Sequence, residues 1–382
     1  MPAPIYRRRA LAPLGALMLL AGCQVHTPFR DANGRANEDM AAVIQAYIRS
    51  GARPVSTLSV QQARTQPTLG AAVRTVVSAQ RGRPLAADRS VQVRDIQVAG
   101  AAGPLLARLY DATPGKRDQP IILYFHGGGW VTGDLNTYDA SDRALAAQAH
   151  AKVLSVAYRL APEARFPAAH DDAFASYRWL LANAAGLGAD PRRIAVAGES
   201  AGGNLAINVS IAARDARIKP PVHQLLIYPV AGTDTGTPSY IADRDAVPLG
   251  RADVLWYVNN VVRSPADLAD PRLDLIGHAD LRRLPPTTVI SAEIDPLQSE
   301  GTFLTSKLQG QGTPVDLRLY GGTTHEFFGM GNVVARAKDA EAYAAQELDT
   351  TFDKIGSPPA PRRGAVSHTV RGRYPALHRR LR

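Results

Sequence analysis

The stretch Arg193-Ile-Ala-Val-Ala-Gly-Glu-Ser-Ala-Gly-Gly203 decides the fold expected for this chain. An apolar run, Ile194–Ala197, leads into a Gly-x-Ser-x-Gly turn, and the residues after the turn continue as an apolar-rich helical pattern. A strand, a sharp turn and a helix in this order form a nucleophile elbow, which strains the backbone at the central serine and points its hydroxyl outward. The alternative is an ordinary strand-to-helix turn that happens to contain Ser200, so the rest of the chain must decide.

Around this turn, predicted strands and helices alternate along the chain. Such alternation favours an α/β fold, with a mostly parallel central sheet flanked by helices on both faces. A polar stretch rich in Pro and Asp interrupts the pattern between residues 230 and 285, and it is interpreted as an insertion over the carboxyl edge of the sheet. The predicted strands are Val91–Val98, Leu105–Tyr110, Pro120–Phe125, Lys152–Tyr158, Ile194–Ala197, Gln224–Tyr228, Thr287–Ala292 and Val315–Tyr320. The predicted helices are Met40–Ile48, Val60–Ala79, Tyr138–His150, Asp171–Ala184, Ala201–Arg214, Asp253–Val262, Leu297–Gln309 and Val334–Ile355.

A glycine loop, His126-Gly127-Gly128-Gly129-Trp130, follows one of these strands. Consecutive glycines allow the backbone to approach a substrate and to turn several amide N–H groups toward one point, where they could hold the oxyanion of an acyl intermediate. A phosphate-binding loop is the alternative, but residue 132 is Thr, which breaks the G-x-G-x-x-G pattern, and no Walker A sequence occurs. We expect His126 to orient the loop.

A serine nucleophile needs a base, and the base needs an orienting carboxylate, in the chain order Ser, Asp or Glu, His for this type of sheet. His325 follows the last predicted strand, and Asp295 has the matching place one strand earlier. Glu293 competes with Asp295 only if that strand continues far enough to aim it at the same point. With Ser200 and the glycine loop, these residues predict a catalytic triad.

No metal or other cofactor is expected. His325-Glu326 begins an H-E-x-x-H zinc motif, but residue 329 is Gly, so the second histidine ligand is missing. Cys23 is the single cysteine of the chain, which excludes a cysteine cluster and an internal disulfide.

Taken together, these motifs resemble the hormone-sensitive-lipase-like branch of the α/β-hydrolases, a group of mainly bacterial carboxylesterases. The likeness spans about residues 57–352. It implies Ser200 as nucleophile, His325 as general base and then acid, and Asp295 as the residue that orients His325. The matching stretches are the glycine loop, Tyr158-Arg-Leu-Ala-Pro-Glu163, Phe166-Pro-Ala, Gly198-Glu-Ser-Ala-Gly-Gly203, Asp295-Pro-Leu and His325.

The resemblance also implies the remaining parts of the site. The oxyanion would be held by the amides of Gly128, Gly129 and Ala201, with support from His126, Gly127 and Glu199. Two residues depart from the pattern of the branch, which often has Asp at position 199 and Gly at position 326, where this chain has Glu at both. The cap of the family would be built from residues 38–80 and 232–270.

The expected activity is therefore hydrolysis of small-molecule esters with short to medium acyl chains, through an acyl-enzyme. An amidase or a deacetylase acting on envelope or xenobiotic compounds would use the same machinery. A non-catalytic small-molecule binder on this fold is the alternative from another class. Nothing indicates a nucleic-acid partner, because the excess arginines cluster at the two ends of the chain.

The N-terminal segment has the layout of a signal peptide: Arg7-Arg8-Arg9, an apolar run Ala10–Leu20, and Leu20-Ala-Gly-Cys23. Its ending resembles the lipobox of bacterial lipoproteins, which implies lipidation of Cys23 and attachment to a membrane of the bacterial cell envelope. Gln24 favours the outer membrane over the inner one. A plain secretory signal, or a misassigned start of a cytoplasmic enzyme, is the alternative.

The C-terminal segment, residues 357–382, begins with Ser-Pro-Pro-Ala-Pro and contains seven arginines and no acidic residue. With the three N-terminal arginines, these equal the whole formal charge of +10, so the alkaline pI describes the ends rather than the site. A solvated, disordered tail is expected, with attraction to anionic lipid as the alternative. The predicted organisation is a signal peptide (1–22), a linker with cap helices (23–88), a hydrolase domain (89–356) and the tail (357–382).

Overall fold

One eight-stranded sheet forms the centre of the chain in the computed structural model, which describes residues 33–83 and 89–356. Its strand order is β1-β2-β4-β3-β5-β6-β7-β8, and β2 is the one of these eight strands that runs in the opposite direction to the others. The predicted α/β fold with a mostly parallel sheet is thus confirmed, and each predicted strand is present. The strands are β1 (Gln92–Ala99), β2 (Pro104–Asp111), β3 (Gln119–Phe125), β4 (Lys152–Val156), β5 (Ala189–Glu199), β6 (Gln224–Ile227), β7 (Thr287–Ile294) and β8 (Val315–Thr324).

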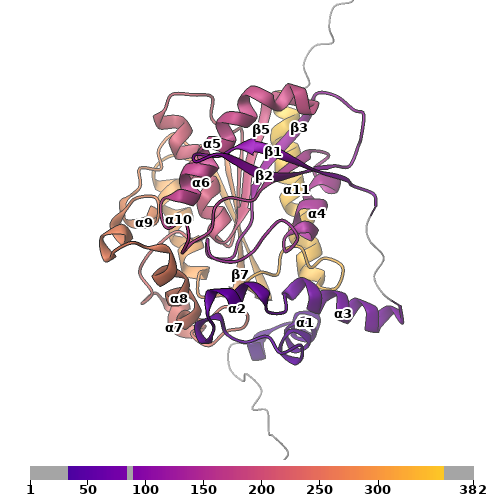
Figure 1. Cartoon of the computed structure of the whole chain (residues 1–382), viewed down its shortest axis with the longest axis vertical. Helices are drawn as coiled ribbons and strands as arrows, with labels where there is room; N and C mark the ends of the chain where they lie inside the picture. Colours follow the sequence, from indigo (N-terminus) through magenta and orange to yellow (C-terminus); the bar gives the residue numbers. More distant parts are fainter. Residues whose placement is uncertain (1–32, 84–88, 357–382) are drawn as a thin grey trace, which may run out of the picture.

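Helices cover both faces of the sheet because its strands are apolar on both sides. β3 is buried along its whole length, and its alternate residues enter two different apolar clusters, Ile121 and Leu123 one, Ile122 and Tyr124 the other. Helices α5 (Ala168–Asn183), α6 (Ala201–Asp215) and α10 (Gln298–Gly310) pack on the first face, and α4 (Asp139–Gln148) and α11 (Ala335–Ile355) on the second (Figure 1).

Two segments far apart in the sequence lie together at one end of the sheet, and we call them the cap layer (Figure 1). The first, residues 38–81, contains α1 (Glu38–Arg49), η2 (Val55–Thr57), α2 (Val60–Thr65) and α3 (Leu69–Arg81). The second, residues 238–261, contains α7 (Pro238–Ala242) and α8 (Arg251–Val261). Hydrogen bonds join them, from Trp256 Nε1 to the Leu58 carbonyl (3.1 Å) and from the Ser56 amide to Asp253 Oδ1 (2.9 Å). The remaining short helices are η1 (Asn33–Arg35), η3 (Ala184–Leu187), η4 (Pro265–Ala269) and α9 (Leu275–His278).

The single helix predicted over Val60–Ala79 is wrong, because the structure has two helices there, α2 and α3. Pro67 disfavours helical backbone at Gln66, which ends α2 in an extended conformation. Thr68 then caps α3 by accepting a hydrogen bond from the Ala71 amide. The resulting turn, Gln66-Pro67-Thr68, faces the cavity described below.

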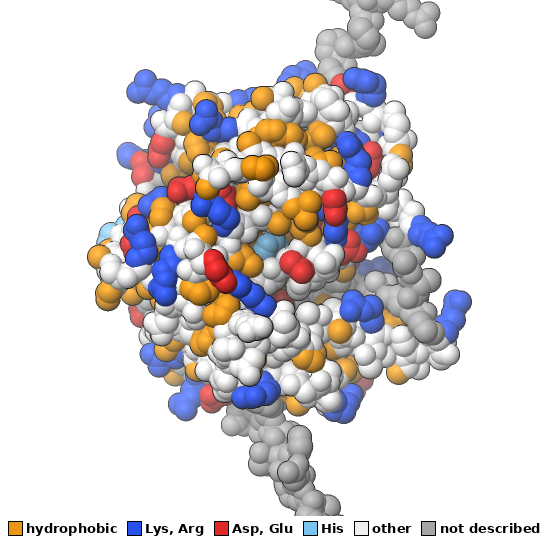
Figure 2. Space-filling view, in the orientation of Figure 1, with side chains coloured by type: hydrophobic (Ala, Val, Ile, Leu, Met, Phe, Trp, Pro, Cys, Tyr) orange, Lys and Arg blue, Asp and Glu red, His pale blue; other side chains and the backbone are white. Residues whose placement is uncertain are grey.

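The predicted lipidation site Cys23, the signal segment and the arginine-rich tail lie outside the described residues. Within the described ranges no helix is long and apolar enough to cross a membrane. Figure 2 shows basic and acidic side chains interspersed over the face that it draws, without a broad area of one sign.

Candidate active site

Ser200 lies on the sharp turn between β5 and α6. Its backbone has φ 54° and ψ −117°, a conformation that L residues rarely adopt. The turn packs closely on the end of β3, since a Cβ at Gly202 would lie 1.9 Å from the Phe125 carbonyl oxygen. Only glycine therefore fits beside the strand, and the motif holds the Ser200 hydroxyl at the carboxyl end of the sheet.

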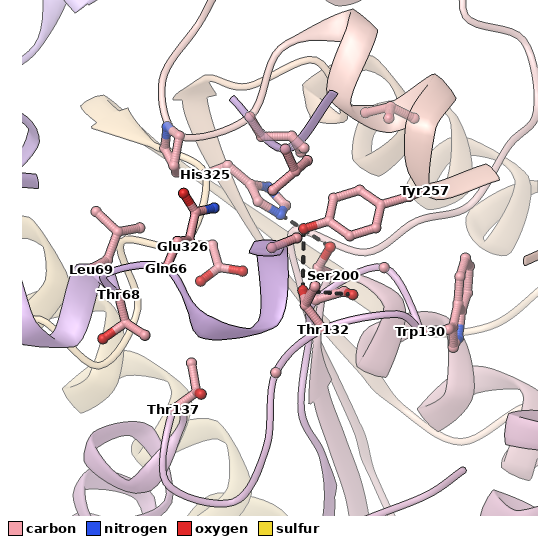
Figure 3. A pocket seen from close by; sticks show the side chains of 18 of the residues that line it. Gln66, Thr68, Leu69, Trp130, Thr132, Thr137, Ser200, Tyr257, His325 and Glu326 are labelled. Carbon is pink, nitrogen blue, oxygen red and sulfur yellow. Dashed lines mark hydrogen bonds between the residues drawn. The ribbon is translucent and has the colours of Figure 1, made fainter. Parts of the chain in front are cut away.

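Three of the predicted residues, Ser200, His325 and Asp295, meet in one hydrogen-bonded chain, and Figure 3 shows Ser200 and His325. His325 Nε2 lies 3.0 Å from Ser200 Oγ, and His325 Nδ1 lies 2.7 Å from Asp295 Oδ2. Asp295 follows β7 directly and His325 follows β8 directly, so two strand ends deliver them to the same edge as the serine. Asp295 is fully buried, and its Oδ1 accepts a hydrogen bond from the Leu297 amide (2.8 Å). These bonds fix the imidazole between carboxylate and hydroxyl.

Glu293, the competing acid, points elsewhere. Its Oε2 accepts a hydrogen bond from the Gly322 amide (2.7 Å), and its Oε1 lies 3.4 Å from Arg35 Nη1. β7 does continue through Ile294, but a register shift after Ala292 separates this part of the strand from regular pairing with β8. Asp295 is thus the acid that reaches the histidine.

The imidazole of His325 is buried, and burial and the neighbouring charges shift its pKa in opposite directions. Burial lowers its pKa, but the charge of Asp295 and the hydrogen bond to it raise the pKa, and the nearby charges of Glu326 and Glu199 add to this. The net effect is a pKa above the ordinary histidine value. The ring also packs against Tyr228, with centroids 4.6 Å apart.

The glycine loop turns beside Ser200. Gly128 and Gly129 have φ values of 92° and 57°, and the Gly128 carbonyl accepts hydrogen bonds from the amides of Val131 and Thr132. Within residues 33–83 and 89–356, the N–H groups of Gly128 and Gly129 have no acceptor. Together with Ala201, the first residue of α6, they supply amide donors next to the serine.

His126 holds the start of this loop. Its ring stacks on Tyr158 with centroids 4.3 Å apart, and the Tyr158 hydroxyl donates to the His126 carbonyl (2.7 Å). Its Nδ1 lies 2.9 Å from the Gly127 carbonyl oxygen. Burial lowers the pKa of His126 to about 4, so the ring is neutral near pH 7 and takes a structural part.

Glu199, next to the serine, is buried and faces away from the cavity. Its two carboxylate oxygens accept hydrogen bonds from the hydroxyls of Tyr124 and Tyr228. Burial raises the pKa of Glu199 to about 7, although hydrogen bonds from Ser141, Tyr124 and Tyr228 oppose the rise. The two tyrosines were not among the predicted residues, since each reads in sequence as an ordinary aromatic residue near a strand end.

Arg64 of α2 is a further residue that no motif indicated. Its guanidinium donates to the carbonyls of Val131 and Ala161 and makes two hydrogen bonds with Glu163, all at 2.8 Å. The first of these carbonyls belongs to the turn that the glycine loop begins. Arg64 thereby ties the cap layer to the loop that carries the amide donors.

A cavity of about 150 Å³ opens at Ser200 (Figure 3). One side is formed by the glycine loop, and both segments of the cap layer contribute to the rest. Its walls include apolar side chains of both cap segments, Val55, Leu69, Leu249, Val254 and Val258.

Across the described residues, no group of three or more His, Cys, Asp or Glu side chains is arranged to hold a metal ion.

Comparison with known proteins identifies the class that this fold and site define. Residues 122–329 match the family model of the alpha/beta hydrolase fold, which is more than half of the chain. The chain therefore belongs to the α/β-hydrolase family. Within that family it falls in the hormone-sensitive-lipase-like branch of esterases, as the relatives below indicate.

Carboxylesterase NlhH of Mycobacterium tuberculosis is 42% identical over 236 residues, which cover 59% of this chain and 72% of the relative. Ethyl acetate hydrolase of Pseudomonas putida is 32% identical over 322 residues, covering 82% and 98%. Among solved structures, an esterase of Pyrobaculum calidifontis superposes with a TM-score of 0.70 at 33% identity, covering 81% of this chain and 97% of that one.

Proposed function

We propose that this chain is a serine carboxylesterase in which Ser200 is the nucleophile, His325 the general base and Asp295 the residue that orients it. The observation that carries the proposal is the unbroken hydrogen-bond chain from Asp295 through His325 to the Ser200 hydroxyl. Its relatives support the reaction, since proteins that share this fold at 32–42% identity are named carboxylesterase and ethyl acetate hydrolase. The chain hydrolyses carboxylic esters.

The reaction begins when His325 Nε2 takes the proton of the Ser200 hydroxyl as its oxygen attacks the ester carbonyl carbon. The charge that develops on the carbonyl oxygen is held by the amides of Gly128, Gly129 and Ala201. His325 then gives the proton to the leaving alcohol, and the acyl group remains on Ser200. Water, deprotonated by His325, attacks this acyl-enzyme and releases the acid.

Short to medium acyl chains fit the site best. The cavity volume of about 150 Å³ is modest, and residues of both cap segments line it together with the glycine loop. An apolar wall of valine and leucine side chains suits a short hydrocarbon chain. A relative named ethyl acetate hydrolase is consistent with a small ester as substrate.

The test is hydrolysis of p-nitrophenyl acetate by wild type and by Ser200→Ala. The variant should lose about 10⁴-fold or more of kcat/KM and keep the wild-type melting temperature, because it removes one oxygen and leaves the turn intact. Wild type should also release a burst of p-nitrophenol equal to the enzyme concentration. Undiminished turnover by the folded variant would refute the proposal, and p-nitroacetanilide measured in parallel distinguishes esterase from amidase preference.

We further propose that Cys23 is lipidated and anchors the enzyme to the bacterial cell envelope, with the outer membrane as its more favoured location. The support is the sequence alone: a basic start, an apolar run and Leu20-Ala-Gly-Cys23 followed by Gln24. Membrane fractionation of wild type and Cys23→Ser tests it. The wild type should sediment with envelope membranes and the variant should not, and equal distribution of the two would contradict the anchor.

A further inference from the structure

Glu326 is the one carboxylate among the described residues that line the cavity at Ser200. It directly follows the catalytic histidine, and its backbone has a φ of 65°. In Figure 3 its carboxylate lies between Ser200 and the turn of Gln66 and Thr68. Glu326 and Ser200 thus line the same cavity.

Among the described residues, only one of the two carboxylate oxygens of Glu326 has a hydrogen-bond donor. Oε1 accepts a hydrogen bond from the Tyr138 hydroxyl (2.6 Å), which fixes the position of the group. Oε2 accepts no hydrogen bond from any residue that the structure describes. Because the side chain is only partly exposed, this oxygen is left with an unused acceptor site that faces the cavity.

No cation of the described part of the chain neutralises Glu326. No Lys, Arg or His nitrogen there lies within 4 Å of its oxygens, so it takes part in none of the ion pairs. Arg64 is a cation that also lines the cavity, but its guanidinium is occupied by Glu163 and two carbonyls. The other two carboxylates near the site are satisfied, Asp295 by His325 and Glu199 by two tyrosines.

Aromatic rings surround the same space. Tyr47, Trp130, Tyr138 and Tyr257 line the cavity. Burial raises the pKa values of Tyr47 and Tyr257, and the charge of Glu326 raises them further, so its field reaches both segments of the cap layer. A carboxylate without an ion-pair partner among the described residues, in a cavity that aromatic side chains also line, offers both interactions that bind alkylammonium groups, charge and cation–π contact.

We propose that this cavity selects short esters that carry an ammonium group. Glu326 would supply the counter-charge, and Tyr47 and Tyr257 of the cap layer would form the walls around the cation. Glu326 acts as a specificity residue: it contacts the substrate away from the scissile bond. The inference rests on the proposed esterase function, and it names the class of ester that the enzyme prefers.

The experiment uses two esters of nearly equal shape, acetylcholine and its uncharged carbon isostere 3,3-dimethylbutyl acetate. The kcat/KM of each is divided by the rate of its alkaline hydrolysis, which removes the difference in intrinsic reactivity. Wild type should favour acetylcholine by about tenfold or more on this corrected scale, as expected for a partly buried charge pair. In Glu326→Gln, which keeps the size and the acceptor for Tyr138, the preference should fall to near unity.

The ratio separates substrate binding from an effect on the triad. Glu326 also acts on His325, and a change there would alter the rates of both esters equally and leave the ratio unchanged. Glu347→Gln, which removes one negative charge from α11 outside the cavity, is the matched control and should keep the wild-type ratio. Added NaCl should reduce the wild-type preference and leave that of Glu326→Gln unaffected.

Three results would overturn the inference: a corrected ratio near one in wild type, a ratio that Glu326→Gln does not change, or turnover of p-nitrophenyl acetate with none of acetylcholine. In each of these cases the esterase function stands. Absence of turnover with every ester, including p-nitrophenyl acetate, would instead refute the proposed function itself. The two failures are therefore distinguishable.

Discussion

The carboxyl edge of the sheet and the cap layer face each other across one cavity, but they are built differently. At the sheet edge, each residue of the proposed triad follows directly on a strand, Ser200 on β5, Asp295 on β7 and His325 on β8. The cap layer has no such frame. Its contributions to the cavity come from turns and helix faces that only tertiary contacts bring together. Strand ends thus position the groups proposed to react, whereas the packing of the cap layer shapes the rest of the cavity.

The largest expected effect comes from a substitution at the sheet edge that preserves the shape of the side chain. Asp295→Asn should lower kcat by about 10⁴-fold, because an amide in place of the carboxylate favours the wrong tautomer of His325 and cannot stabilise the imidazolium. The melting temperature should fall little, since the amide fills the same space. Steady-state kinetics with p-nitrophenyl acetate and a thermal melt measure the two effects.

Glu293→Gln is the matched control for this variant. Glu293 precedes Asp295 by two residues on the same segment, but it bonds to the Gly322 amide and Arg35 instead of the histidine. Its substitution should change kcat by no more than a few-fold. If Glu293→Gln lost most of its activity and Asp295→Asn remained nearly active, Glu293 and not Asp295 would be the residue that orients His325.

The sequence predicted the sheet edge well for a physical reason. Each reacting residue there lies in a short motif whose local backbone is set by glycine or by a strand end, so spacing along the chain carries the three-dimensional information. The same holds for the glycine loop, where positive φ values at Gly128 and Gly129 need glycine. The roles of the amide donors and of Glu199 were expected from family resemblance, and the bonding of Glu199 to two tyrosines emerged only in the fold.

The cap layer was less predictable because its contacts are long-range. The break between α2 and α3 depends on Pro67, whose effect a weak helical pattern concealed. Arg64 reads as an ordinary surface cation in sequence, and its bonds to Val131 and Ala161 depend on how α2 docks. Glu326 could be noted only as a departure from family pattern, and its unpaired carboxylate is visible only in the assembled cavity.

A change in the cap layer should have a smaller effect of a different kind. Arg64→Met keeps the aliphatic stem but leaves the Val131 and Ala161 carbonyls and Glu163 without their donor. We expect kcat/KM to fall about tenfold, mainly through KM, because the loop that shapes the cavity loosens while the triad remains intact. Substrate-saturation curves with p-nitrophenyl acetate separate the two constants.

Arg53→Met is the control for Arg64→Met within the same segment. Among the described residues, its exposed guanidinium bonds only to Thr57, four residues away, and it does not line the cavity. This variant should match wild type in both constants. If Arg64→Met instead lowered kcat with KM unchanged, the cap layer would act on the chemical step and the division between the two regions would fail.

The smallest expected effect lies where the two regions meet, at Glu326. His325 must be neutral to accept the serine proton, so kcat/KM should fall as the pH drops through the pKa of His325. Asp295, Glu326 and Glu199 overcome the effect of burial and raise that pKa, which places the acidic limb above the ordinary histidine value of 6.5. Glu326→Gln removes one of the negative charges that favour the imidazolium. The limb should therefore move to lower pH, and Glu347→Gln should leave it in place. A limb that stays fixed or moves upward in Glu326→Gln would show that the Glu326 charge does not act on the triad, and the charge would then serve the cavity alone.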